Sequence, residues 1–108
     1  MTHEMKIKIW LDDIRSPPDE SWTWCKNAKE AIFLLDNSPV SIISFDHDLG
    51  EDSGSGYDVA KFIEQVTHCN NFQPIEWRIH SANSVGRKNI FMAMDSCEKV
   101  WGANKNPS

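Results

Sequence analysis

The sequence lacks the features of a secreted or zinc-finger protein. It has three cysteines in 108 residues, Cys25, Cys69 and Cys97, and no Cys-x-x-Cys pair. An odd number of widely spaced cysteines favours neither a disulfide framework nor a zinc site. We therefore expect free thiols in a reducing compartment.

Long apolar runs and an excess of basic residues are also missing. No apolar stretch approaches the roughly 20 residues that span a bilayer, and residues 1–4 lack the basic-then-apolar start of a signal peptide. Lys and Arg number 11 against 16 Asp and Glu, which gives a formal net charge of -5. This charge argues against broad binding along a nucleic-acid backbone, and we expect no DNA duplex as a partner. A local basic spot around Arg78, Arg87 and Lys88 is the alternative. We expect a cytoplasmic protein with no membrane partner.

What the chain has is an alternation of apolar runs and helical patterns. Runs that predict strands lie at about 6–11, 22–25, 40–45 and 75–79, with a short last one at 99–101. Helical patterns lie at about 27–36, after the loop 51–56, and at 84–97, whereas the Pro-containing segment 14–21 reads as a loop. The alternation favours one α/β domain with a mainly parallel sheet over residues 1–108, its core at about 6–101.

Three of the predicted strands end in polar clusters. The clusters are Asp12-Asp13, Asp46-His47-Asp48 and His80-Ser81-Ala82-Asn83. The carboxyl ends of parallel strands share one edge of a sheet, and open α/β sheets bind their ligands at that edge. We therefore expect the three clusters to form one site.

The acids of this edge predict a metal site. Asp12, Asp13, Asp46 and Asp48 stay ionised close together only if a cation compensates their charge. Oxygen ligands suit Mg²⁺ or Mn²⁺, and such an ion also engages phosphate oxygens. The competing interpretation makes Asp12, Asp13 and Asp48 helix caps or turn residues, a common use of Asp after strands.

Two histidines and several donors lie beside these acids. A carboxylate neighbour raises the pKa of an imidazole, so His47 and His80 are candidates for general acid or base work. A structural histidine bonded to backbone, or a ligand of Mn²⁺ or Fe²⁺, is the alternative for either ring. The candidate phosphate-binding residues are Ser81, Asn83, Arg15 and Arg87, with a merely solvated role as the alternative for Arg87.

Tryptophan is frequent for a chain of this size. We expect Trp10, Trp22, Trp24 and Trp77 to pack in the core. The alternative is that Trp22 or Trp24, at the edge of the sheet, stacks on a base.

The motifs together resemble a known family. They are Leu11-Asp12-Asp13-x-Arg15 with Pro17, Phe45-Asp46-His47-Asp48-Leu49-Gly50, Gly56-x-Asp58, and His80-Ser81-Ala82-Asn83 with Gly86. This set resembles the cyclic-phosphate processing receiver-like family, relatives of two-component receiver domains in bacteria and phages. The resemblance implies a flavodoxin-like three-layer sandwich with strand order 2-1-3-4-5. It also implies action on cyclic phosphates of nucleotides or RNA ends, in a setting such as phage or bacterial defence or RNA repair.

The resemblance also maps receiver positions onto this chain. Asp12, Asp13 and Asp46 match the Mg²⁺-binding acids of receivers, Asp46 matches the phosphate acceptor, and Ser81 matches the Ser or Thr after the fourth strand. The Lys expected after a fifth strand has no clear match, since Lys99 precedes the predicted strand. A Pro-rich loop replaces the first helix. The missing Lys and the additional His47, Asp48 and His80 favour hydrolysis over a phosphorelay.

The leading hypothesis is a metal-dependent phosphoesterase acting on a cyclic phosphate. In this hypothesis Asp12, Asp13 and Asp46 bind the metal, and Asp48 or His47 orients the attacking water. His80 protonates the leaving oxygen, and Arg15 and Ser81 neutralise charge on the phosphate oxygens. One alternative is a phosphoacceptor receiver that is not an enzyme. The other is a binding module that sequesters a cyclic nucleotide or docks a protein.

Overall fold

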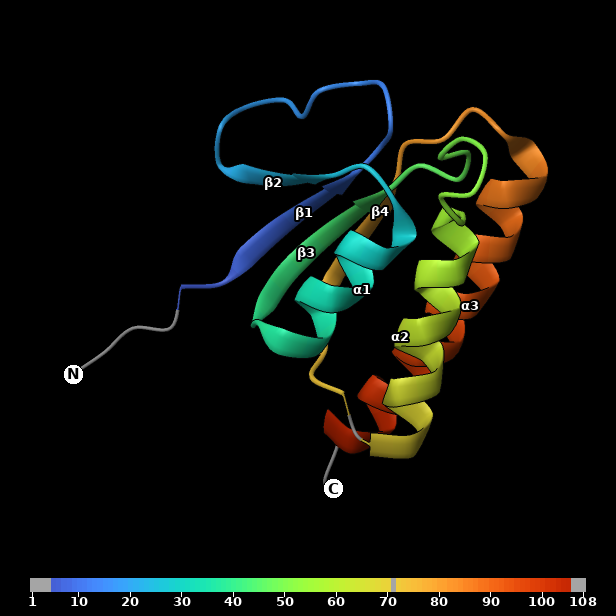
Figure 1. Cartoon of the computed structure of the whole chain (residues 1–108). Helices are drawn as coiled ribbons and strands as arrows, with labels where there is room; N and C mark the ends of the chain where they lie inside the picture. The colour runs from blue at the N-terminus through green and yellow to red at the C-terminus, as the bar shows by residue number, and fades with distance from the viewer. Residues whose placement is uncertain (1–4, 71, 106–108) are drawn as a thin grey trace.

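The structure, a computed structural model, describes residues 5–70 and 72–105 and is built on a parallel sheet (Figure 1). The strands are β1 (Ile7–Leu11), β2 (Trp22–Cys25), β3 (Val40–Phe45) and β4 (Glu76–Ile79), and the helices are α1 (Ala28–Asn37), α2 (Gly56–Asn70) and α3 (Ser84–Lys105). The strand order is β2-β1-β3-β4, and each neighbouring pair is parallel. The predicted α/β class and the order of the first four strands are confirmed.

Local sequence signals explain how α1 begins. The side chain of Asn27 accepts a hydrogen bond from the Glu30 amide at 2.9 Å, which caps the helix. The Glu30 carboxylate reaches back and accepts from the Lys26 amide, also at 2.9 Å. Both bonds satisfy amide groups at the point where the chain leaves β2 and enters the helix.

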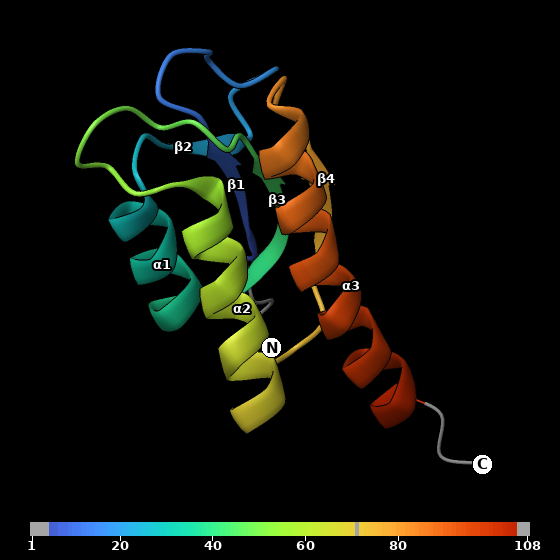
Figure 2. The same ribbon diagram turned by 90° about the vertical axis from the view of Figure 1, so that its right-hand side faces the viewer.

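All three helices lie on the same side of the sheet (Figure 2). Alternate strand residues such as Ile9, Ile43 and Phe45 point toward them and are fully buried. The helices contribute matching apolar stripes, which include Ile63 of α2 and Met94 of α3. The main core is therefore a single layer between the sheet and the helices. None of the described helices combines the length and the apolar character needed to cross a bilayer.

The predicted fifth strand at 99–101 is wrong. Those residues belong to α3, and the sheet ends at β4 within the described part of the chain. Trp101 is 3% exposed and follows Cys97 by four residues and Met94 by seven, so it continues the buried stripe of the helix. The helical pattern outweighs the local strand preference of this short run.

The predicted third layer is also wrong for the residues that the structure describes. Residues 12–21, which join β1 to β2, form no helix, and the sheet face turned away from the helices carries no helical cover. Trp10, Trp22 and Trp24 lie on this face, outside the core cluster, whereas Trp77 packs against the core from the helix side. The expectation of core packing therefore holds for Trp77 alone among the four.

Candidate metal and phosphate site

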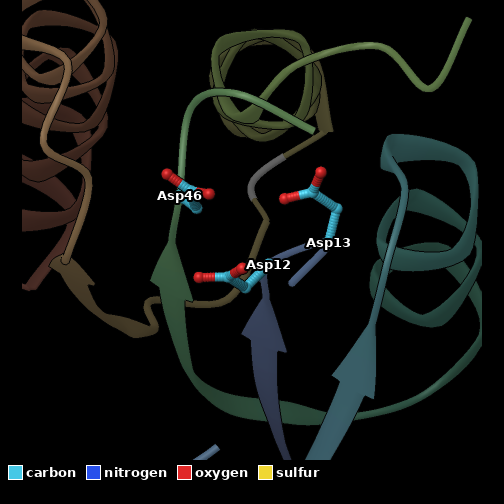
Figure 3. Close-up of side chains that lie close together, drawn as sticks. All are labelled: Asp12, Asp13 and Asp46. Carbon is cyan, nitrogen blue, oxygen red and sulfur yellow. The ribbon is translucent and has the colours of Figure 1, made fainter. Parts of the chain in front are cut away.

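Three carboxylates converge at the carboxyl edge of the two central strands (Figure 3). Asp12 and Asp13 follow β1, and Asp46 follows the adjacent strand β3. One ligand oxygen from each residue lies within 4.8 Å of the others. The predicted meeting of these three acids is confirmed.

Asp12 is held by donors on both of its oxygens. Its Oδ1 accepts hydrogen bonds from the backbone amides of Ile14 and Arg15, at 2.9 and 2.8 Å. Its Oδ2 lies 3.0 Å from Nε2 of His80. Since a carboxylate oxygen has two lone pairs, Oδ2 keeps one that can face a cation. The carboxylate is buried and fixed in direction before any ligand arrives.

His80 lies in a closed set of contacts behind Asp12. Its Nδ1 lies 2.7 Å from the hydroxyl of Ser44, and its ring stacks on Trp10 at a centroid distance of 4.0 Å. Burial lowers the pKa of His80, although the Asp12 carboxylate opposes that shift. The arrangement therefore fits a neutral imidazole that donates from Nε2 to Asp12 and accepts the Ser44 hydroxyl at Nδ1.

Of the neighbouring acids Asp12 and Asp46, Asp46 has the surroundings that favour its ionised form less. Burial and the negative charge of Asp12 raise the pKa of Asp46, while hydrogen bonds from the His47 amide and the Ser81 hydroxyl act in the opposite direction. The amide bond from His47 to Oδ1 is 2.8 Å long. This electrostatic conflict between neighbouring acids is the kind that a bound cation relieves.

A second group of side chains surrounds Asp48. His47 Nδ1 lies 3.1 Å from Asp48 Oδ1, and the Asn83 amide nitrogen lies 3.3 Å from both carboxylate oxygens. These bonds lower the pKa of Asp48. Asn83 also caps α3, because its Oδ1 accepts from the Gly86 amide at 2.8 Å. The cap residue of α3 thus ties Asp48 to the start of that helix.

Glycine is required where the His47 ring meets α3. A Cβ built on Gly86 would overlap the ring carbons of His47. The ring therefore packs directly on the helix backbone, and its exposure is 22%. His47 does not line the cavity described next, so its predicted catalytic role has less geometric support than that of Asp48.

The acids open into a cavity of about 560 Å³. Its lining comprises Asp12, Asp13, Ile14, Arg15, Asp46, Asp48, Gly50, His80 and Ala82. It therefore gathers most of the predicted site residues with the guanidinium-bearing Arg15. Lysine is absent from this described lining. Lys99, the nearest match in sequence to the receiver lysine, pairs instead with Asp95 on α3 at 3.5 Å.

The remaining predicted phosphate ligands, Ser81, Asn83 and Arg87, are not part of the cavity lining. Ser81 is 4% exposed and lies beside Asp46. Nη1 of Arg87 donates to the backbone oxygens of Ile79 and Ser81, at 3.3 and 3.1 Å, so this guanidinium is engaged at the end of β4. Direct binding of phosphate by Ser81, Asn83 and Arg87 stays a prediction.

Sequence reasoning missed one contributor to the site, Ser44. It is the lone hydroxyl in the apolar run Ile42-Ile43-Ser44-Phe45 and is 3% exposed. A buried polar residue in a central strand needs a hydrogen-bond partner. The sequence therefore indicated that Ser44 has such a partner. The partner, His80, could not be identified without the parallel pairing of β3 with β4.

A parallel sheet of this order, with an acidic pair after β1 and an Asp after β3, defines a receiver-like domain. The sequence model of the Cyclic-phosphate processing Receiver domain matches residues 7–96, and the chain belongs to this family. Neither a search of curated proteins nor a search of solved structures found a match.

The residues present fit a divalent cation. Asp12, Asp13 and Asp46 offer only carboxylate oxygens, the hard donors that Mg²⁺ and Mn²⁺ take. Asp13 lies against Gly50, where a Cβ would come within 3.5 Å of its Oδ2. The backbone of Gly50 has a φ of 91°, a conformation that favours glycine. The glycine at position 50 therefore allows the turn that lies beside Asp13.

Proposed function

We propose that this domain is a metal-dependent phosphoesterase that hydrolyses cyclic phosphates of nucleotides or RNA ends. The observation that carries the proposal is the convergence of three carboxylates with Arg15 in one open cavity. Four acids in the lining would repel a phosphate unless a cation stood between them. The family description and the acidic triad therefore support the same chemistry.

The metal would be held by Asp12, Asp13 and Asp46. A bound Mg²⁺ or Mn²⁺ supplies Lewis-acid stabilisation of negative charge on phosphate and makes water more acidic. The Arg15 guanidinium, exposed at the cavity wall, binds phosphate oxygens and neutralises charge that develops on them. The Ser81 hydroxyl would hold Asp46 through the hydrogen bond that it donates to this carboxylate.

Asp48 orients the attacking water by accepting its hydrogen bond. The bonds from His47 and Asn83 hold the carboxylate in one direction, which lowers the cost of ordering the water. The water oxygen forms a new bond to phosphorus while one P–O bond of the cyclic ester breaks. The proton that the water loses balances the proton that the leaving oxygen gains, and the product is a phosphomonoester or an opened phosphodiester.

For His80 we propose a positioning role in place of proton donation. Both ring nitrogens already have partners, Asp12 and Ser44, and donation to a leaving group would break the bond to Asp12. The stacked Trp10 ring restricts rotation of the imidazole. His80 then acts through Asp12 by holding its Oδ2 toward the metal position.

The test is a turnover screen with four substrate classes: 2′,3′-cyclic mononucleotides, 3′,5′-cyclic mononucleotides, cyclic oligonucleotides and short RNAs that end in a 2′,3′-cyclic phosphate. Phosphorus NMR follows the reactions in Mg²⁺, and chromatography follows those in Mn²⁺, which broadens the resonances. We expect one class to be converted, with the rate lost in Asp46→Asn. If none of the classes turns over with either metal, the proposal fails.

A second candidate, a phosphoacceptor receiver, is favoured by one contact. Asp46 follows β3 and meets the Ser81 hydroxyl that follows β4, the arrangement that the resemblance assigns to the acceptor and its partner. This candidate predicts an acyl phosphate on Asp46 after incubation with a small phosphodonor and Mg²⁺. Intact mass spectrometry decides, because an unchanged mass counts against it.

A further inference from the structure

The sheet face opposite the helices carries a group of tryptophans that the proposed function leaves unused. In the parallel register Lys8 pairs with Trp22 and Trp10 pairs with Trp24, which places these four side chains on the same face. The three indoles are half-buried, and no helix of the described chain covers them. A face built of large rings at the surface favours binding of a flat apolar ligand.

The rings are held in place by contacts with the cavity's own residues. Nε1 of Trp10 donates to the backbone oxygen of Arg15 at 2.8 Å, and Nε1 of Trp24 donates to that of Asp12 at 2.7 Å. Trp10 also stacks on His80, and Trp22 meets Trp10 edge-on at a centroid distance of 5.7 Å. Trp10 and Trp24 therefore contact residues that line the acidic cavity.

Cations accompany the rings, although the chain as a whole is acidic. Lys8 Nζ lies 4.6 Å from the ring centroid of Trp22, and Lys26 Nζ lies 4.5 Å from that of Trp24. Arg78 is exposed on the same face, at the position of β4 that pairs with Ser44. Within the described residues none of these three cations forms an ion pair with a carboxylate. Lys8 also donates to the Ser21 hydroxyl at 2.9 Å, and its charge helps to lower the pKa of Asp19.

We propose that this face binds a single-stranded RNA whose cyclic phosphate end lies in the acidic cavity. Bases stack on Trp22 and Trp24 in the positions that the Lys8 and Lys26 ammonium groups occupy over the rings, and these ammonium groups move to the phosphates between the bases. Stacked aromatic rings beside cations are a general means of binding single strands without reading their sequence. The inference rests on the proposed function for the position of the RNA end, and it selects RNA ends over free cyclic mononucleotides as the substrate.

Binding can be tested without turnover. The probe is a fluorescein-labelled hexauridylate with a 3′-phosphate, the product-like end, and anisotropy is read in Mg²⁺. We expect Trp22→Ala to weaken binding by about tenfold or more, as loss of a base stack does. Trp77→Phe, on the helix side, is the matched control and should bind as the wild type does.

A second variant guards against a folding defect in Trp22→Ala. Lys8→Ala removes a cation but no ring, and it should reduce the slope of log affinity against log salt by about 0.7, the value for one phosphate contact on a single strand. Unchanged RNA binding in both variants would overturn the inference. So would sedimentation that shows a dimer lost in Trp22→Ala, because a second copy would then occupy the face. Neither result depends on whether the protein hydrolyses anything.

Discussion

At the scale of single residues, the two facing acids of the site differ in how their charge is supported. Asp12 is nearly inaccessible, yet it accepts two backbone amides and the His80 ring. Asp46 has fewer donors and faces the charge of Asp12. In the absence of metal, the ionised Asp46 carboxylate therefore destabilises the folded protein, although the proposed metal site needs this carboxylate ionised.

This conflict predicts how Asp46→Asn changes stability. Burial first, and the Asp12 charge second, raise the pKa of Asp46 in the folded protein. A carboxyl with a raised folded pKa destabilises the fold increasingly as pH rises from about 3.9, its unfolded value, through the folded pKa. In EDTA, Asp46→Asn should resist urea better than wild type at neutral pH. The advantage should shrink toward pH 4, and a difference independent of pH would contradict this account.

The role of His80 is tested by separating metal binding from chemistry. If the ring positions Asp12, His80→Ala should weaken Mn²⁺ binding, measured by calorimetry, by roughly 10- to 100-fold, the usual effect of losing a group that orients a metal ligand. Saturating Mn²⁺ should then restore much of the turnover. A variant with normal Mn²⁺ affinity and no turnover would instead support proton donation by His80.

At the scale of elements, α3 offers a matched pair of glycines. Gly86→Ala places a methyl group into the His47 ring, so we expect a loss of about 1–3 kcal/mol in unfolding free energy, as in other overpacked sites. Nothing lies within 4 Å of a Cβ at Gly102, so Gly102→Ala should gain about 0.5–1 kcal/mol from helix propensity alone. Urea unfolding measures both changes. Equal effects of the two substitutions would contradict the packing of His47 on α3.

Most elements of this fold could be predicted from local patterns. The four paired strands and the cap at Asn27 follow from apolar runs and capping residues. The end of α3 could not be predicted in this way, because the pattern of 99–101 also fits a strand. The contact of Trp101 with the core favours the helix, and this contact is visible only in the structure. The position of the tryptophans depends on which sheet face the helices cover, and a local pattern does not carry that information.

The site could be predicted in part, for a related reason. The parallel topology brings strand ends together, so the convergence of Asp12, Asp13 and Asp46 was accessible from the sequence. Which side chains face the cavity and which turn behind it depends on packing. Arg87 shows this, since its guanidinium is used by backbone oxygens at the end of β4.

At the scale of the whole molecule, the domain is a receiver-like fold with two layers described in place of three. The helices cover one face of the sheet (Figure 2), and the pairing of β1 with β2 places Trp10, Trp22 and Trp24 on the other face. The acidic cavity lies at the carboxyl edge of β1 and β3. In the proposed function, an RNA end would reach the cavity from this open face as well as from the rim.

Metal binding should stabilise the whole molecule. A ligand that binds only the folded state at 100 times its Kd adds about 2.7 kcal/mol to the free energy of unfolding. We expect Mg²⁺ or Mn²⁺ to raise the Tm of the wild type, and to raise it much less in Asp13→Asn and Asp46→Asn. Differential scanning fluorimetry suffices for the measurement. An equal rise in all three proteins would place the metal elsewhere.

The most direct test of the central claim is the rate of cyclic-phosphate hydrolysis as a function of Mg²⁺. Phosphorus NMR would compare wild type with Asp46→Asn, using a 2′,3′-cyclic phosphate at the end of a short RNA. We predict a saturable dependence on Mg²⁺ in the wild type, no turnover in EDTA, and none in the variant although it folds. Turnover that persists in EDTA, or in Asp46→Asn, would contradict the account.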